Sequence, residues 1–191
     1  MQRLKDRIRA EGRILPGSII KIDGFLNHKV DVGLAREMAR EFTKLFDLQG
    51  LTMVLTVEAS GIALGTVCAE EWGVPLLFAK KAKSDNIEGG LYHSDIFSYT
   101  YNKKVTLLIA RQWLGPCDKV LIIDDFLANG EALRGLADIA DQAGAEILGI
   151  GIAVEKGFQP GGRNLREAGY NVKSLVIIDK ADENGFVFRD D

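Results

Sequence analysis

Two adjacent aspartates, Asp124 and Asp125, follow an apolar run of strand length. Such a pair is costly to bury unless hydroxyl groups or a cation meet it, because like charges repel and burial removes water. A turn of sequence FLANG (126–130) comes next, before a helical pattern. Backbone N–H groups at the start of a helix bind anions, and the small Ala128 and Gly130 leave room for a phosphate. The segment therefore predicts a sugar-phosphate site, with hydroxyls at the acids and the phosphate at the turn.

The elements that must position this site can be read from hydrophobic patterns. Six apolar runs have the length of strands: 52–57, 75–79, 105–110, 119–124, 147–154 and 174–179. Their hydrophobicity is continuous rather than alternating, which indicates strands buried on both faces of a mostly parallel central sheet. Helical patterns occur at 33–46, 61–72 and 131–143, and a short amphipathic one near the N-terminus. We therefore predict one α/β domain, 1–191, flanked by helices, with ligands at the carboxyl ends of its strands.

Composition and motifs disfavour several classes of protein. The net charge of −3 and the pI near 5.5 argue against binding of nucleic acid or acidic membranes as the main activity. No signal-peptide core is present, and no apolar run approaches the roughly 20 residues of a membrane span. Cys68 and Cys117 are too few for a disulfide framework or a zinc site. No Lys-Ser or Lys-Thr pair follows Gly130, so the turn is not a P-loop. We expect a cytoplasmic protein that acts on small molecules.

Two further polar segments follow predicted strands. Lys80, Lys81 and Lys83 come directly after the run 75–79. Such lysines ordinarily form a solvated face, but at a strand end they also suit the neutralisation of an anionic leaving group. Residues 84–102 are polar and aromatic, and a connection of this length is typical of a functional flap or hairpin.

The segment around the acid pair resembles the type I phosphoribosyltransferases, whose signature is an apolar strand, two acidic residues and a turn ending in Thr-Gly-x-Thr. In that family the acids engage the ribose hydroxyls of phosphoribosyl pyrophosphate (PRPP), and the turn cradles its 5′-phosphate. The resemblance assigns Asp124 and Asp125 to the ribose. It assigns to the phosphate Ala128, Asn129, Gly130, Glu131 and Ala132. Asn129 and Ala132 replace the usual threonines; an Asn amide still donates, whereas Ala132 offers only its backbone N–H.

A closer resemblance, over nearly the whole chain, is to the xanthine phosphoribosyltransferase branch of this family. It is carried by IIDDFLANG (122–130), FLNH (25–28) and AVEKGFQPGG (153–162). This branch transfers the 5-phosphoribosyl group from PRPP to N9 of xanthine, giving xanthosine 5′-monophosphate and pyrophosphate in purine salvage. The resemblance also implies a homodimer, a flap or hood over the strand ends, and Mg²⁺ bound mainly through PRPP rather than by dedicated protein ligands.

The same resemblance assigns roles around the leaving group. It gives the pyrophosphate-binding loop, within VEASGIA (57–63), to Ala59, Ser60 and Gly61. Ser60 read alone is as readily an ordinary helix N-cap. Lys81 is our first choice for neutralising charge that develops on the pyrophosphate. Residues 84–102 resemble the mobile flap that excludes water from the activated ribose.

Base recognition is assigned to Ile20, Asn27 and Lys156. An ammonium donates only, so Lys156 matches the 6-oxo group of a purine and not the 6-amino group of adenine, although residue statistics alone favour a surface lysine. Asn27 is expected to donate to the 2-oxo group of xanthine, and Ile20 to contact the base through its backbone or apolar atoms. Phe158 or Phe25 is expected to pack on the ring.

Two alternatives stay open. The first is a related enzyme that prefers guanine or hypoxanthine. The second is a non-catalytic regulator that senses PRPP. Regulators of this kind generally carry an added nucleic-acid-binding element with a basic surface, whereas only about thirty residues precede the helix predicted at 33–46 and the chain is acidic overall.

Overall fold

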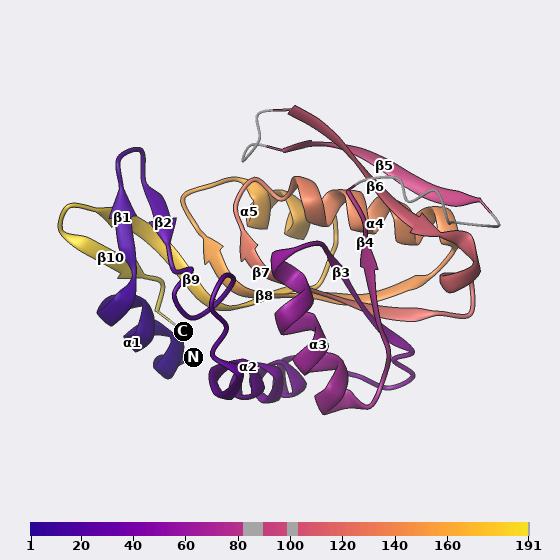
Figure 1. The fold of residues 1–191 in the computed structure, drawn as a ribbon, viewed down its shortest axis with the longest axis horizontal. Coiled ribbons are helices and arrows are strands. Elements are labelled where there is room, and N and C mark those ends of the chain that lie inside the picture. Colours follow the sequence, from indigo (N-terminus) through magenta and orange to yellow (C-terminus); the bar gives the residue numbers. More distant parts are fainter. Residues whose placement is uncertain (82–89, 99–102, 191) are drawn as a thin grey trace.

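A six-stranded sheet forms the centre of the computed structural model, which describes residues 1–81, 90–98 and 103–190. In spatial order its strands are β10 (Gly185–Phe188), β9 (Val172–Asp182), β8 (Glu146–Lys156), β7 (Lys119–Leu127), β3 (Met53–Val57) and β4 (Leu76–Ala79). All neighbouring pairs are parallel except β10 with β9, which is antiparallel at one edge. The prediction of a mostly parallel sheet is confirmed (Figure 1).

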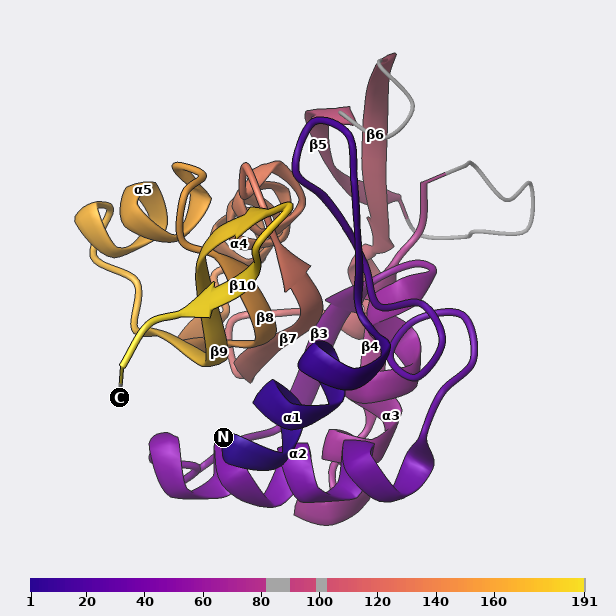
Figure 2. The same cartoon turned by 90° about the vertical axis from the view of Figure 1, so that its left-hand side faces the viewer.

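Helices cover both faces of this sheet. Helices α2 (Val32–Leu45) and α3 (Ser60–Trp72) lie on one face, and α4 (Glu131–Ala143) and α5 (Gly161–Glu167) on the other (Figures 1 and 2). Strand β7 shows why its apolar run is continuous. Leu121 and Ile123 belong to the core beneath α2 and α3, whereas the alternate residues Val120 and Ile122 belong to the core beneath α4.

Two antiparallel hairpins stand outside the central sheet. Strands β5 (Leu91–Ser98) and β6 (Lys103–Ala110) pair with each other and pack on α4. The run 105–110 does form a strand, but the prediction that this strand belongs to the central sheet is wrong. Its neighbour along the chain supplies its ladder, and its apolar side chains, Leu107 among them, pack on α4 instead of between two helical layers. A short 3₁₀ turn, η1 (Arg111–Trp113), follows.

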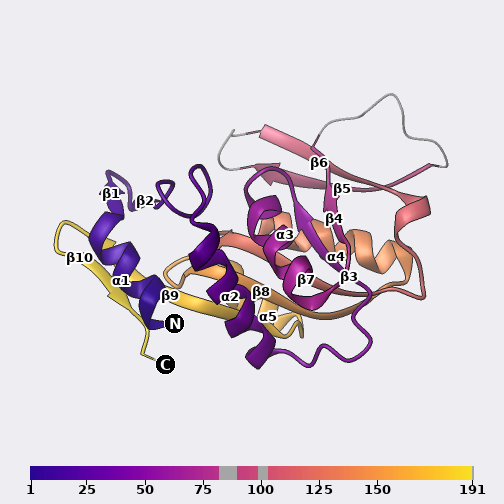
Figure 3. The same cartoon turned by 60° about the horizontal axis from the view of Figure 1, so that its bottom comes forward.

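The second hairpin belongs to the N-terminal part. Helix α1 (Gln2–Glu11) buries Leu4 and Ile8 and packs beside β9 and β10, as Figure 3 shows. Strands β1 (Arg13–Leu15) and β2 (Ile19–Lys21) follow as a hairpin, and the chain then reaches α2 through residues 22–31. This arrangement brings residues 20–27 over the carboxyl end of the sheet.

Several predicted boundaries shift. The helices at 33–46, 61–72 and 131–143 begin and end within one residue of the prediction. Strands β7 and β8 run further than predicted, so Asp124 and Asp125 lie inside β7 rather than at its carboxyl end, and Lys156 is the last residue of β8. Strands β1, β2 and β10 and helix α5 are additions that the apolar runs did not indicate.

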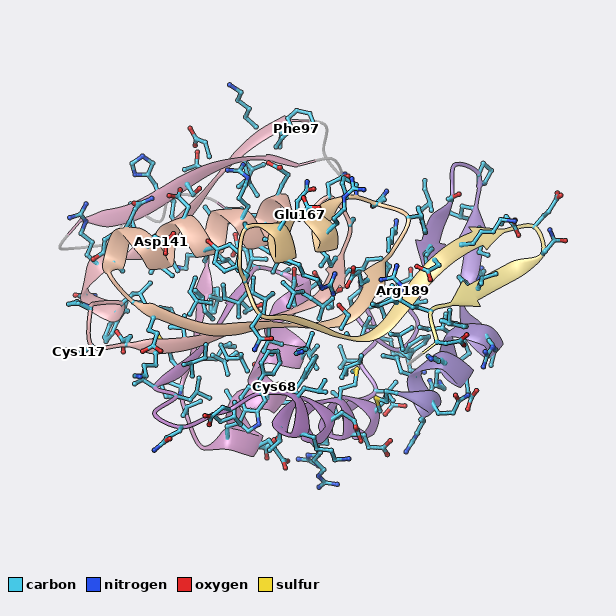
Figure 4. The ribbon with its side chains drawn as sticks, turned by 180° about the vertical axis from the view of Figure 1, so that it is seen from behind. Cys68, Phe97, Cys117, Asp141, Glu167 and Arg189 are labelled. Atoms are coloured by element: carbon cyan, nitrogen blue, oxygen red, sulfur yellow. The ribbon has the colours of Figure 1, made fainter. Side chains whose placement is uncertain are left out.

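The two cysteines lie in different surroundings. Cys68 is buried between the sheet and the helices, whereas Cys117 is exposed in a loop, and both thiols are free (Figure 4). Burial raises the pKa of the Cys68 thiol, so it stays protonated and inert. Over residues 1–81, 90–98 and 103–190, no helix has the length and apolarity to cross a membrane.

Candidate active site

A cavity of about 500 Å³ opens at the carboxyl ends of β3, β4, β7 and β8. It brings together most of the residues singled out in the sequence: Ile20, Asn27, Ser60, Lys81, Asp124, Asp125, Ala128, Asn129, Gly130, Glu131, Ala132 and Lys156. The same cavity is lined by Phe126 and by Ile96 and Phe97 of β5, which sequence reasoning did not single out. Segments more than 100 residues apart in the chain therefore meet in one hollow.

The acid pair is almost fully buried. Asp124 and Asp125 are 5% and 2% exposed, and the backbone N–H of Asp125 donates to Oδ1 of Asp124 at 3.0 Å. Burial, and then the neighbouring Asp125 charge, raise the pKa of Asp124 well above its ordinary value, while the Lys81 ammonium acts in the opposite direction. The charged form of the Asp124 carboxyl is therefore destabilised, and hydroxyl groups or a cation bound beside it would stabilise that form.

The raised pKa of Asp124 predicts how the stability of the fold depends on pH. Because the folded pKa of Asp124 lies above its unfolded value of 3.8, the folded state loses stability as pH rises from that value through the folded pKa. We expect Asp124→Asn to raise the free energy of unfolding at neutral pH by about 1–2 kcal/mol. Urea unfolding would be measured at neutral pH and near pH 3.8, and the gain in free energy of unfolding should be smaller at the lower pH. A variant less stable than the wild type at neutral pH would contradict this prediction.

The first turn of α3 approaches the acid pair at Gly61. A Cβ on Gly61 would lie 2.2 Å from Thr56 Oγ1 and 2.8 Å from Asp124 Oδ1, so only glycine fits there. Thr56 cannot swing away freely, because its hydroxyl donates to the Ile123 carbonyl at 2.6 Å. Ser60 lines the cavity, whereas Ala59 is exposed and Gly61 is buried behind Ser60.

The reading of Ser60 as an ordinary N-cap is wrong. Ala59 occupies the N-cap position of α3, and Ser60 is the first helical residue. Its hydroxyl therefore stands at the first turn of the helix, where backbone N–H groups favour anions. The Glu58–Ala59 peptide directly before it is cis.

Lys81 lies where the β4 strand leaves the sheet. Its backbone N–H donates to Glu58 Oε1 at 2.5 Å, which ties the end of β4 to the turn after β3. Its side chain lines the cavity and acts electrostatically on Asp124. Lys83, the third lysine of this run, lies outside the described residues, as do 84–89 and 99–102 of the predicted flap.

The turn predicted at 126–130 is shorter in the structure, because Phe126 and Leu127 belong to β7. Gly130 adopts φ +83 and forms the N-cap of α4, a left-handed conformation that favours glycine. Residues 128–132 all line the cavity at this helix start. The carboxylate of Glu131 is held by Arg134 at 2.8 Å, and this ion pair lowers the pKa of Glu131. The turn therefore presents backbone amides, with the Glu131 charge compensated by its own helix.

The same cavity holds the residues assigned to the base. Lys156 lines it with its ammonium 5.3 Å from the centroid of the Phe126 ring, and burial lowers the pKa of Lys156. Asn27 donates from Nδ2 to Asp125 Oδ2 at 2.7 Å, linking the predicted base and ribose positions. Phe25 is 1% exposed in the core, and Phe158 borders a different cavity. Phe126 is the phenylalanine that stands beside Lys156.

Metal ligands are sparse in this region. Within the ranges the structure describes, no group of three or more His, Cys, Asp or Glu side chains is placed to hold a metal ion. The acidic residues that line the cavity are Asp23, Asp124, Asp125 and Glu131.

Comparison with solved structures identifies the fold. The chain superposes on an adenine phosphoribosyltransferase from Giardia lamblia with a TM-score of 0.77 and 23% identity, covering 93% of this chain and 98% of that one. The enzyme of the same name from Thermoanaerobacter pseudethanolicus gives a TM-score of 0.71 at 21% identity, covering 91% and 99%. Both superpositions show that the chain has the fold of these phosphoribosyltransferases.

Sequence relatives narrow the class. A xanthine phosphoribosyltransferase of Lachnoclostridium phytofermentans is 48% identical over 193 residues, covering 100% of both chains. One of Ruminiclostridium cellulolyticum is 50% identical over 185 residues, covering 97% of each. The chain belongs to the xanthine phosphoribosyltransferase family. A scan against family models returned no match.

Proposed function

We propose that this chain transfers the 5-phosphoribosyl group of PRPP to N9 of xanthine, releasing pyrophosphate and xanthosine 5′-monophosphate in purine salvage. The observation that carries the proposal is the single cavity in which amides 128–132, the acid pair Asp124 and Asp125, and the donors Asn27 and Lys156 meet. These groups match a phosphate, ribose hydroxyls and the two oxo groups of xanthine. Family membership supports the same assignment.

The roles follow from the chemistry of each group. The amides of 128–132 bind the 5′-phosphate, and Asp124 and Asp125 accept hydrogen bonds from the ribose hydroxyls. Ser60 and the turn that includes Ala59 and Gly61 bind the pyrophosphate, and Lys81 stabilises its developing charge. As pyrophosphate leaves, positive charge grows on the ribose ring, and N9 of the base attacks from the opposite face.

The base end selects by donor and acceptor pattern. Lys156 donates to the 6-oxo group, and Asn27, already oriented by its bond to Asp125, donates to the 2-oxo group. A guanine would present an amine to Asn27, and an adenine would present an amine to Lys156, so each leaves a donor facing a donor. Ile20 contributes an apolar or backbone contact to the base.

Three further features belong to this proposal. Asp124 and Asp125 would be the carboxylates available to Mg²⁺ carried by PRPP, and the cation would supply charge neutralisation for the pyrophosphate. The β5–β6 hairpin, from which Ile96 and Phe97 line the cavity, helps to exclude water from the activated ribose. We further propose that the chain acts as a cytoplasmic homodimer.

The direct test is a panel of bases. With PRPP and Mg²⁺ present, initial rates of pyrophosphate release would be measured separately with xanthine, guanine, hypoxanthine and adenine. We expect kcat/KM for xanthine to exceed that for adenine by at least about 1,000-fold, because a site built on hydrogen bonds rejects mismatched groups by such factors. A preference for guanine or hypoxanthine would keep the reaction but change the substrate, and activity with adenine alone would overturn the role of Lys156.

The alternative left open by the sequence, a PRPP-sensing regulator, is disfavoured by the family to which the chain belongs. It keeps the sugar-phosphate site but requires no productive base site, so it predicts PRPP binding without pyrophosphate release on any of the four bases. A filter-binding assay with DNA and RNA would complete that comparison, because a regulator needs a nucleic-acid partner. We expect turnover with xanthine and no retention of nucleic acid.

A further inference from the structure

A pair of glycines at the start of α5 lies between the phosphate turn and strand β8. The N–H of Gly161 donates to the Ala128 carbonyl at 3.1 Å. A Cβ on Gly161 would lie 2.3 Å from that carbonyl oxygen and 2.7 Å from the Gly130 nitrogen. Both neighbours are backbone atoms, which cannot rotate aside as a side chain can. The turn assigned to the 5′-phosphate therefore rests directly on the backbone of α5.

The next glycine packs on a buried carboxylate. A Cβ on Gly162 would lie 2.0 Å from Glu155 Oε1 and 2.8 Å from Arg166 Nη1. Glu155 is 2% exposed and accepts two hydrogen bonds from Arg166, at 2.9 and 2.7 Å, and a third from the Ser174 hydroxyl. Bidentate pairing of this kind fixes both partners in direction as well as distance. The pair thus fastens α5 to β8.

Glu155 directly precedes Lys156 at the end of β8. Successive side chains of a strand point to opposite sides, so Glu155 faces α5 while Lys156 faces the candidate active site. A chain of contacts results, running from Lys156 through the backbone of β8 to Glu155, Arg166 and α5, and from Gly161 to the phosphate turn. Within this series of contacts, Lys156 is the one residue that we assigned to the base.

We propose that the ion pair of Glu155 with Arg166 is a positioning brace, which holds the base-binding Lys156 at a fixed separation from the phosphate-binding turn. This inference rests on the proposed function, because it assumes that base and phosphate bind at those two places. A ligand that occupies both places at once needs that separation to be correct. A ligand that occupies only the phosphate end does not.

Calorimetric titration with two ligands separates these cases. Xanthosine 5′-monophosphate spans both ends, whereas ribose 5-phosphate reaches only the sugar-phosphate end. Arg166→Lys keeps the positive charge beside Glu155 but loses the bidentate geometry. We expect it to raise the Kd of the nucleotide roughly tenfold and that of ribose 5-phosphate less than about twofold, because small misplacements of an oriented pair are costly.

Two glycine substitutions provide a second route that leaves every charge in place. Gly162→Ala displaces Glu155 and should repeat the selective loss of nucleotide affinity, even if Arg166→Lys fails to fold. Gly161→Ala displaces the phosphate turn itself and should weaken both ligands. Gly115→Ala is the matched control, because a Cβ there meets nothing within 4 Å; it should leave both Kd values unchanged.

The outcomes distinguish the brace from the proposed function. If the wild-type chain binds both ligands but folded Arg166→Lys and Gly162→Ala change the two Kd values by the same factor, or change neither, the brace is wrong and the proposed function stands. Unchanged binding of ribose 5-phosphate to Gly161→Ala would also overturn the brace. If the wild-type chain binds neither ligand, the proposed function fails and the brace with it.

Discussion

Asp125→Asn should lower kcat/KM for phosphoribosyl transfer by about 100-fold or more, while the chain stays folded. The Asp125 carboxylate is 2% exposed and faces the cavity, so its charge acts on a bound ribose with little screening by water. Removing one preorganised electrostatic group from such a site costs about 100- to 1,000-fold in rate. Steady-state kinetics with varied PRPP would measure the loss.

The hydrogen bond from Asn27 makes this variant informative in a second way. An Asn at position 125 accepts from Asn27 with only one of its two ends, so the orientation of Asn27 is no longer imposed. We expect the preference for xanthine over guanine to narrow as well. Unchanged steady-state rates in a folded Asp125→Asn variant would remove the acid pair from the mechanism.

Gly61→Ala should have an effect of similar size through shape alone. Its new Cβ would meet Thr56 Oγ1 at 2.2 Å and Asp124 Oδ1 at 2.8 Å, and Thr56 is held by its bond to Ile123. The start of α3 must then move outward, taking Ser60 away from its place in the cavity. A shift of about 1 Å in a group that orients a reactant costs roughly 100-fold in rate.

Gly65→Ala is the matched control for that substitution. Gly65 lies one turn further along α3, and its Cβ would meet the flexible end of Leu76 at 2.9 Å without approaching the acid pair. It should reduce thermal stability slightly and leave the kinetic constants of the folded protein in place. If Gly61→Ala retains kcat/KM within about twofold of Gly65→Ala, the close approach of this turn to Asp124 has no catalytic meaning.

Periodicity predicts elements well where packing is local. The helix from Glu131 to Ala143 has the predicted limits, because Gly130 and Gly144, both at positive φ, cap its two ends. Strand partners are a different matter. The run 105–110 is as apolar as the central strands, and its sequence does not say that it pairs with β5 and packs on α4. Hydrophobic pattern reports burial and not the identity of the neighbour.

In the candidate site, too, the sequence predicts what is local and misses contacts between distant segments. Asp124, Asp125 and the turn 128–132 stand out because their chemistry is concentrated in one stretch of sequence. The bond between Asn27 and Asp125 joins residues 98 positions apart, and the fit of Gly61 depends on Thr56 and Asp124 together. Among nine phenylalanines, only the fold distinguishes Phe126, which faces the cavity, from Phe25 in the core.

The most direct measurement is a crystal structure of the chain with PRPP and Mg²⁺ at saturating concentration. Our account predicts the 5′-phosphate against the amides of residues 128–132, the ribose hydroxyls at Asp124 and Asp125, and the pyrophosphate beside Ser60 and Lys81. PRPP bound in any other hollow of the protein, or bound here with its phosphate turned away from that turn, would contradict it.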